Sequence, residues 1–264
     1  MRSSASQNST LRFSDRVENY IRWRPSYPDE LFRVLAEEAG LRQPSTVADI
    51  GSGTGISAEL FLRQGHTVYG VEPNREMRQA AENLLSQFPL FRSIDGTAEE
   101  STLSDASVDF ISAAQAFHWF EADKARAEFS RILRTGGWCA LIWNSRRIDS
   151  TPFLRDYEML LNEYGTDYRE IQHTSIDRAK IEAFYAPGTY RYRSLYNEQR
   201  FNWEGLRGRV LSSSYIPAEG HPQHAPLMEK LAEIFKTHQA DEQVCFEYDT
   251  EIHLGQMPTP QASP

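Results

Sequence analysis

Three glycines at alternate positions follow a short apolar run near the start of the chain. The run VADI, which ends at Ile50, leads directly into Gly51, Gly53 and Gly55 and then into a helical pattern. Glycine permits positive φ and a close approach of ligand to backbone, and the start of a helix offers unpaired N–H groups. The spacing therefore predicts a loop that holds a ligand against bare backbone.

Two acidic residues narrow the class of that ligand. Asp49 stands directly before the loop, where it would repel a pyrophosphate but suit a cofactor with an amine and a sulfonium. Glu72 ends the next apolar run about 20 residues further on, where an acidic side chain can reach the two ribose hydroxyls of an adenosine. A dinucleotide loop needs G-x-G-x-x-G, but Ile56 occupies the position of its third glycine. The pattern favours a cationic adenosine cofactor over a nicotinamide-dependent dehydrogenase.

The order of elements that must position these residues predicts an α/β fold. Five strand-like runs, which begin near residues 46, 67, 90, 108 and 138, alternate with helical patterns. Such alternation is typical of right-handed βαβ crossovers in a mostly parallel sheet. The runs at 189–203 and 244–255 alternate polar and apolar residues and predict two further strands at one edge.

Helix signals and the composition of the two termini predict how the chain is organised into a domain with polar ends. We expect helices over 29–40, with Asp29 as a cap and Gly40 as a stop, and over 124–137. Residues 1–12 and 257–264 are polar or Pro-punctuated and are expected to be disordered. The rest, 13–256, is predicted to be a single domain, with an N-terminal arm at 13–30 over the site and a helical cap at 150–186 inserted between the fifth and sixth strands.

Composition restricts location and partners. A formal net charge of -9 disfavours nucleic acid and anionic membrane surfaces, so a small-molecule acceptor is expected. No secretory signal or long apolar run stands out, so a cytoplasmic location is expected. A monomer or a homodimer is expected. The two cysteines and seven histidines lack metal-ligand spacing, so no metal is expected.

The motifs VADIGSGTG, VEPNREM, DGTAEE, SVDFISAAQAFHWF and LRTGGWCALIWNSR together resemble the class I S-adenosylmethionine-dependent methyltransferases. The resemblance extends from about Phe13 to Gly255. FSDRVENYIRWRPSYP and FHWF further resemble the small-molecule branch that includes trans-aconitate methyltransferases. The resemblance implies a Rossmann-like, seven-stranded, mostly parallel sheet with helices on both faces. It also implies S-adenosyl-L-methionine as cofactor and S-adenosyl-L-homocysteine as product.

The resemblance also implies the cofactor contacts. The glycine loop would line the methionine part, Asp49 would lie near the amine and Glu72 would bind the ribose. The segment after the third strand would grip the adenine, and the residue that ends the fourth strand would lie beside the methyl group. The expected contacts are Tyr20, Arg24, Asp49, Gly51, Ser52, Gly53, Gly55, Glu72, Pro73, Met77, Thr97, Ala98, Glu99 and Gln115.

The acceptor side leaves two chemistries open. For a carboxylate, which is already ionised near pH 7, Arg22 and Arg146 could serve as clamps. For a hydroxyl, His118 is the candidate base. Tyr215 is a further candidate, whereas Arg207 and Arg209 fit a solvated helix face as well as a pocket. A catalytically inactive S-adenosylmethionine-binding regulatory or scaffold protein is the alternative function.

Overall fold

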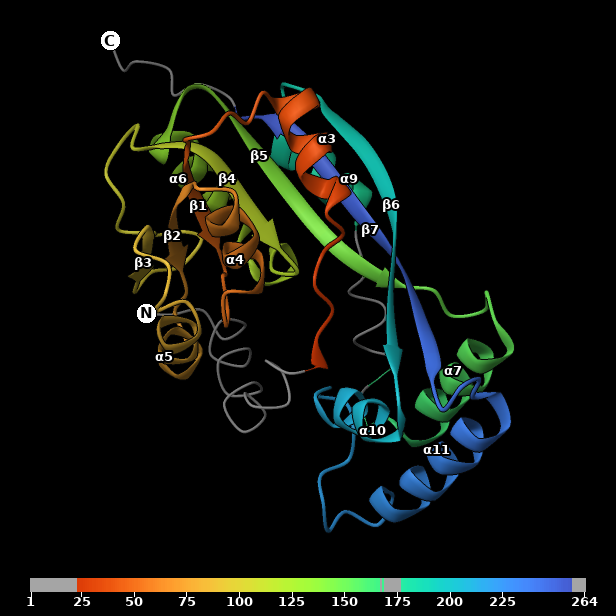
Figure 1. The fold of residues 1–264 in the computed structure, drawn as a ribbon. Coiled ribbons are helices and arrows are strands. Elements are labelled where there is room, and N and C mark those ends of the chain that lie inside the picture. The colour runs from red at the N-terminus through yellow and green to blue at the C-terminus, as the bar shows by residue number, and fades with distance from the viewer. Residues whose placement is uncertain (1–22, 167, 169–176, 258–264) are drawn as a thin grey trace.

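The computed structural model describes residues 23–166, 168 and 177–257, and these residues form a seven-stranded sheet covered by helices (Figure 1). The strand order is β3-β2-β1-β4-β5-β7-β6. The strands from β3 to β5 are parallel, and β7 is antiparallel to both β5 and β6. The bounds are β1 Thr46–Ile50, β2 Thr67–Val71, β3 Phe91–Ile94, β4 Val108–Ala114, β5 Leu133–Arg146, β6 Tyr190–Phe201 and β7 Val244–Gln256. The predicted mostly parallel Rossmann-like sheet is confirmed.

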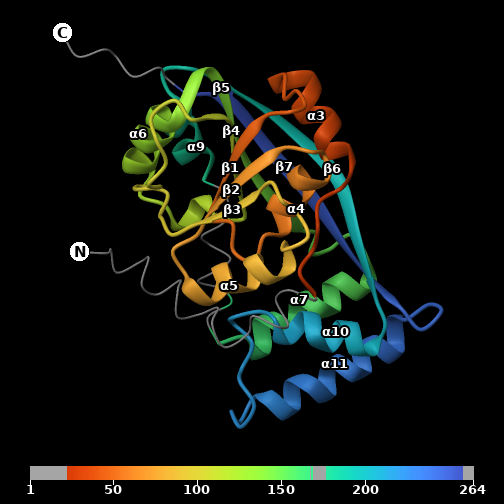
Figure 2. The same ribbon diagram turned by 60° about the vertical axis from the view of Figure 1, so that its left-hand side comes forward.

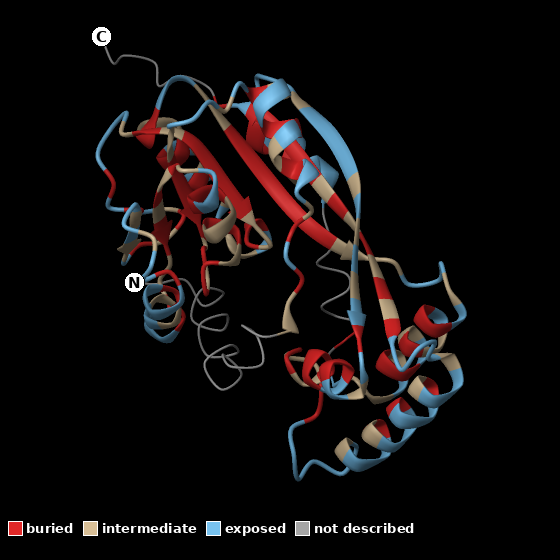
Figure 3. Ribbon diagram, in the orientation of Figure 1, coloured by how far each residue is buried: buried red, intermediate tan, exposed pale blue. Residues whose placement is uncertain are grey.

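The burial of each strand reflects its place in the sheet. Most side chains of β1 and β4 are buried, because helices cover central parallel strands on both faces. Their sequences are accordingly almost continuously apolar. In the edge strand β6, many residues are exposed, and exposed and partly buried positions alternate along its second half (Figure 3). That alternation is the period-two pattern that predicts the strand.

Helices lie on both faces of the sheet (Figure 2). On one face are α3 Glu30–Ala39, α4 Ile56–Arg63 and α5 Arg75–Leu84. On the other face are α6 Ala122–Ile132 and α9 Arg178–Tyr185. Phe129 of α6 and Phe184 of α9 meet edge to face, with ring centroids 5.6 Å apart. Across the described ranges, none of the helices combines the length and the apolar character needed to cross a membrane.

A separate group of three helices lies beyond the ends of β5 and β6 (Figure 1). We call these helices the cap: α7 Pro152–Tyr164, α10 Trp203–Leu211 and α11 His224–His238. These helices and the first half of β7 share a hydrophobic core. Tyr157 of α7, Leu231 of α11 and Phe246 of β7 are buried in this core. This core is distinct from the two clusters on the faces of the sheet. The cap is therefore a third packing unit with its own interior.

The two described helices of the segment 150–186 pack in different parts of the molecule. α7 packs against α11 in the cap, whereas α9 packs against α6 on the sheet. The remaining cap helices, α10 and α11, come from the connection between β6 and β7. Two insertions, one after β5 and one after β6, thus build one helical unit.

Two predicted helix signals need correction. The helix expected over 124–137 ends at Ile132, and its last residues open β5, with an irregular register between Val108 and Phe110 on β4. Asp29 makes no side-chain capping bond, although Gly40 does end α3 in the left-handed region with φ +63°. Helix propensity alone could not show that the pairing with β4 extends back to Leu133.

The described part of the N-terminal arm, residues 23–28, connects the sheet with the cap. The indole of Trp23 meets Phe201 edge to face at 6.0 Å, and Gly208 of α10 leaves room for it. A β-carbon on Gly208 would stand 2.0 Å from Nε1 of Trp23. The carbonyl of Ser26 accepts hydrogen bonds from Asn144 on β5 and Asn197 on β6. The described part of the arm is thereby held by the cap at Trp23 and by the sheet at Ser26.

We expect Gly208→Ala to destabilise the protein by about 1–3 kcal/mol, because the added methyl group displaces Trp23. Denaturant titration measures the effect. Arg207→Ala, at an exposed position on the same helix, is the control and should change the free energy of unfolding by less than about 0.5 kcal/mol. An unchanged midpoint for Gly208→Ala would contradict the packing of the arm on α10.

Candidate active site

The glycine loop after β1 adopts the conformation that its sequence predicts. Gly51, Gly53 and Gly55 have φ values of +70°, +56° and +88°. A β-carbon on Gly51 would stand 2.6 Å from that of Ala116, whereas no described atom lies within 4 Å of one on Gly53. Between them, Ser52 is buried. The loop therefore packs against the turn after β4 at Gly51, whereas at Gly53 no described side chain covers the backbone.

Asp49, the penultimate residue of β1, is fully buried. Its Oδ2 accepts a hydrogen bond of 2.6 Å from the Ser57 hydroxyl of α4, and Ser112 is its paired neighbour on β4. Among the described residues its Oδ1 has no hydrogen-bond partner. Burial raises the pKa of Asp49 to about 6, since the nearby hydroxyls offset only part of the desolvation. A buried carboxylate with one open oxygen suits a cationic ligand.

Glu72 follows β2 and ties the glycine loop to the neighbouring strand. Its Oε2 accepts a hydrogen bond from the Gly53 amide at 3.0 Å, and its Oε1 accepts one from the Asn74 amide at 2.8 Å. Burial raises the pKa of Glu72 despite these donors and Arg78. Asn74 in turn caps α5 by accepting a hydrogen bond from the amide of the buried Met77. Pro73, between Glu72 and Asn74, is partly buried.

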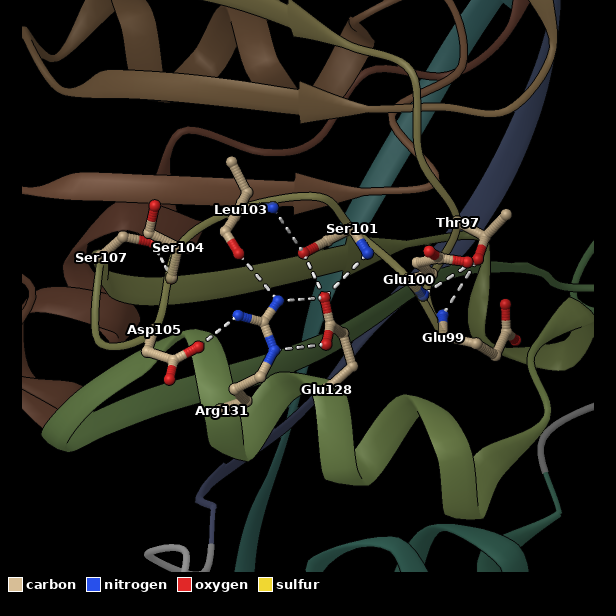
Figure 4. A network of polar contacts seen from close by, with 10 residues as sticks. All are labelled: Thr97, Glu99, Glu100, Ser101, Leu103, Ser104, Asp105, Ser107, Glu128 and Arg131. Atoms are coloured by element: carbon tan, nitrogen blue, oxygen red, sulfur yellow. Dashed lines mark hydrogen bonds and ion pairs between the residues drawn. The ribbon is translucent and has the colours of Figure 1, made fainter.

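The loop after β3 is folded on its own hydrogen bonds (Figure 4). The Thr97 hydroxyl accepts from the amides of Glu99 and Glu100 at 3.3 and 3.1 Å, and Ala98 is buried. The Glu99 carboxylate accepts from the Glu121 amide at 2.9 Å. The predicted adenine-binding segment thus has its hydroxyl and carboxylate engaged within the protein, and its backbone is held in one conformation.

An ion pair on α6 anchors the same loop (Figure 4). Glu128 accepts hydrogen bonds from the amide and the hydroxyl of Ser101 at 2.8 and 2.5 Å, and from Arg131 at 2.7 Å. Burial raises the pKa of Glu128, but Arg131 and Ser101 lower it by more, so the net shift is downward. The loop is therefore joined to the helix layer by charge-assisted hydrogen bonds.

Gln115 directly follows β4 and has a strained backbone conformation. Its φ is +57°, which costs a non-glycine residue about 1–3 kcal/mol. Its backbone N–H donates to the Ile142 carbonyl at 2.8 Å, and its side-chain Nε2 donates to the Asn144 carbonyl at 3.2 Å. Both bonds go to β5, so the side chain is fixed at the ends of the two central strands.

His118 lies in the short 3-10 turn Phe117–Trp119 after β4. Phe117 anchors the turn by packing on Phe184 at 4.8 Å, while His118 is surrounded by protein atoms but keeps contact with solvent. The Lys180 ammonium lies 5.0 Å over the Phe117 ring and donates to the Phe120 carbonyl. Desolvation by the surrounding protein and the Lys180 charge lower the pKa of His118 to about 4. His118 is therefore neutral at pH 7 and a weak base.

The remaining candidates are the predicted cofactor contacts Tyr20 and Arg24 and the predicted acceptor residues Arg22, Arg146 and Tyr215. Tyr20 and Arg22 lie outside the described residues. Arg24 donates to the Ser212 carbonyl at the end of α10 at 3.3 Å. At the end of β5, Arg146 donates to the Glu158 carboxylate at 2.5 Å and to the Tyr168 hydroxyl at 2.8 Å. The Tyr215 ring lies 4.9 Å from that of Tyr168, so the structure brings Arg146 and Tyr215 together in the cap.

Sequence reasoning missed two residues of these sites, Ser57 and Ser112, which lie next to Asp49. A serine in the mostly apolar second half of β4 was an available signal. The choice that the sequence leaves open for Arg207 and Arg209 is settled by the fold: Arg209 is only 6% exposed, whereas Arg207 on the same helix is exposed. Nothing in the local sequence distinguishes these two arginines.

Comparisons with known proteins identify the family. The methyltransferase domain family matches residues 48–141. An uncharacterized methyltransferase of Mycobacterium tuberculosis is 39% identical over 181 residues, 67% of this chain and 71% of the relative. A methyltransferase-like protein of Schizosaccharomyces pombe is 27% identical over 88% of this chain and 89% of its own length. The chain belongs to the class I S-adenosylmethionine-dependent methyltransferases.

Solved structures share the fold over most of the chain. A structure named as a type II methyltransferase from Anaeromyxobacter dehalogenans has a TM-score of 0.65 at 24% identity, and the match covers 89% of this chain and 98% of that one. The geranyl diphosphate C-methyltransferase of Streptomyces coelicolor, in complex with Mg²⁺, geranyl diphosphate and S-adenosyl-L-homocysteine, has a TM-score of 0.51 at 12% identity, with 96% and 98% covered.

S-adenosyl-L-methionine is the cofactor, and the residues around the loop fit it. The Oδ1 atom of Asp49 is buried and has no hydrogen-bond partner among the described residues, so it can bind a cation, and no described atom would lie within 4 Å of a β-carbon on Gly53. The bound cofactor supplies an electrophilic methyl group. In the part of the chain that the structure describes, no cluster of three or more His, Cys, Asp or Glu side chains could hold a metal ion.

We expect Asp49→Asn to stabilise the unliganded protein at pH 7 by up to about 3 kcal/mol, the cost of ionising a carboxyl whose pKa rises from 3.8 to about 6 on folding. Because the folded state holds this proton more tightly, the cost develops as pH rises from about 4 to 6. Chemical denaturation of both proteins across that range measures the difference. Parallel stability curves would show that Asp49 is not buried in its ionised form.

Proposed function

We propose that this enzyme transfers the methyl group of S-adenosyl-L-methionine to a small metabolite that bears a carboxylate or a hydroxyl group. The observation that carries the proposal is the position of the arm between the end of β5 and the cap. Ser26 of the arm accepts hydrogen bonds of 3.1 and 2.7 Å from Asn144 and Asn197, and Arg24 donates to Ser212 of the cap. An acceptor site bordered by the sheet, the arm and the cap suits a compact molecule.

We assign the cofactor side by the chemistry of each group. The Asp49 carboxylate holds the amine, Glu72 holds the ribose hydroxyls and Gln115 borders the methyl group. The remaining contacts are backbone or packing contacts from the glycine loop, the start of α5, the loop after β3 and the arm. They are made by Gly51, Ser52, Gly53, Gly55, Pro73, Met77, Thr97, Ala98, Glu99, Tyr20 and Arg24.

Methyl transfer from a sulfonium is an in-line displacement, so the protein must align the nucleophile and exclude water. For a carboxylate acceptor, Arg22 and Arg146 orient the anion, and Tyr215 closes the pocket beside them. For a hydroxyl acceptor, His118 takes the proton. The geranyl diphosphate methyltransferase, whose structure contains a small anionic molecule, supports a small acceptor in this fold.

Incubation with S-adenosylmethionine labelled in its methyl group and a fractionated metabolite extract tests the proposal. We expect the label to appear in the low-molecular-weight fraction. Cofactor binding without transfer to any small molecule, or transfer only to protein or nucleic acid, would overturn it.

We expect Glu72→Ala to weaken cofactor binding by about 1–3 kcal/mol, as for the loss of a hydrogen bond to a charged group. Isothermal titration calorimetry with S-adenosylhomocysteine measures the affinity. Glu82→Ala, at an exposed position on α5, is the matched control. Equal affinities for the two variants would refute the ribose assignment.

We expect His118→Ala to keep most of the rate with a carboxylate acceptor, because no proton is removed and a group with a pKa of about 4 is a weak base. Steady-state kcat and cofactor affinity are the readouts. A loss of about 100-fold or more at unchanged cofactor affinity would instead indicate base catalysis on a hydroxyl acceptor.

A further inference from the structure

Two arginine side chains are buried together inside the cap. Arg146 extends into it from the end of β5 and its side chain is 12% exposed, whereas Arg209 comes from α10 and is 6% exposed. Both act electrostatically on Tyr157 and Tyr215. The two guanidinium groups therefore lie close enough to the same two phenols to interact with them electrostatically.

Arg146 has a full set of partners. It bonds to Glu158 and Tyr168, and its guanidinium lies 5.0 Å over the Tyr157 ring. The ion pair with Glu158 is itself largely buried, with 13% of the glutamate side chain exposed. This pair is electrically neutral.

Arg209 has no counter-charge among the residues that the structure describes. It donates to the Ser213 hydroxyl at 3.1 Å and lies 5.9 Å over the Phe246 ring, next to Tyr248. Its Nε is buried without a hydrogen-bond partner, and none of the described carboxylates forms an ion pair with it. Burial raises the pKa of Tyr157 and Tyr168, so these phenols are uncharged at pH 7 and cannot supply the missing negative charge.

The described residues of this cluster therefore carry one positive charge in excess: Arg146 and Arg209 against Glu158. A buried charge without a partner costs several kcal/mol, and proteins rarely keep one unless a ligand compensates it. An arginine fork with an open N–H and flanking phenol hydroxyls is well matched to the oxygens of a carboxylate or a phosphate.

The cluster also lies next to the reacting end of the fold. Arg146 is two residues beyond Asn144 on β5, so their side chains lie on the same face of the sheet. The Asn144 carbonyl holds Gln115, and its side chain holds the arm. Tyr215 is only partly buried, which leaves the cluster an approach from outside.

We propose that Arg209, with Arg146 and the phenols of Tyr157, Tyr168 and Tyr215, forms a binding site for an anionic oxygen group, a carboxylate or a phosphate, of the methyl acceptor. That this anion belongs to the acceptor rests on the proposed function. The anion site itself follows from the charge imbalance in the cap. Arg209 is a specificity-determining residue in this assignment.

Thermal denaturation of the protein saturated with S-adenosylhomocysteine tests the site. The probes are malonate and inorganic phosphate at constant ionic strength, with sodium chloride as reference, and they distinguish a carboxylate from a phosphate site. For the wild-type protein we expect the melting temperature to rise by roughly 3–6 °C for each tenfold increase in the free anion concentration above the Kd of the site.

Arg209→Met should abolish this rise and increase the melting temperature measured without anion, because it removes an uncompensated buried charge. Arg207→Met, the exposed arginine on the same helix, should keep the wild-type response. Arg209→Lys, which keeps the charge but not the fork, should respond about tenfold more weakly in anion concentration.

Three results would overturn the inference: no anion response in the wild-type protein, an unchanged response in Arg209→Met, or a lower anion-free melting temperature for that variant, which would make Arg209 a structural group. These outcomes are separate from those of the methyl-transfer assay. Anion binding without methylation of any small molecule would support the anion site but refute the proposed function.

Discussion

The pairing of β5 with β7 holds the two halves of the molecule together. The ladder continues from Trp138 opposite Gln256 to Arg146 opposite Tyr248. Its first part belongs to the sheet, and its last residues enter the cap (Figure 1). A slip by one residue would turn each side chain to the opposite face, so one register places Asn144 at the donor side and Arg146 in the cap.

Near that ladder, several polar groups of the site lower the stability of the unliganded protein. Asp49 is buried with an open oxygen, Gln115 has a strained backbone and Arg209 has no counter-charge among the described residues. Apolar packing offsets these costs, because three hydrophobic clusters surround the site without sharing its polar groups. Such separation of stable cores from an unfavourable site is common in enzymes.

The donor half could be predicted from the sequence because its signals are local. The glycine spacing, the adjacent Asp49 and the alternation of strands with helices depend only on nearby residues. The cap could not be predicted in full, because α10 and α11 join α7 through tertiary packing. The burial of Arg209 and exposure of Arg207 likewise depend on which face of α10 meets Phe246, which no local pattern encodes.

The separate core of the cap has an evolutionary consequence. The residues that match the methyltransferase domain family, 48–141, hold the donor loop, whereas the arm and all three cap helices lie outside them. Substitutions in distant, independent cores are close to additive in their effects on stability. Under the proposed function, the arm and the cap can therefore diversify without disturbing the half that binds the methyl donor, so new acceptors can be acquired by remodelling the helices at the ends of β5, β6 and β7.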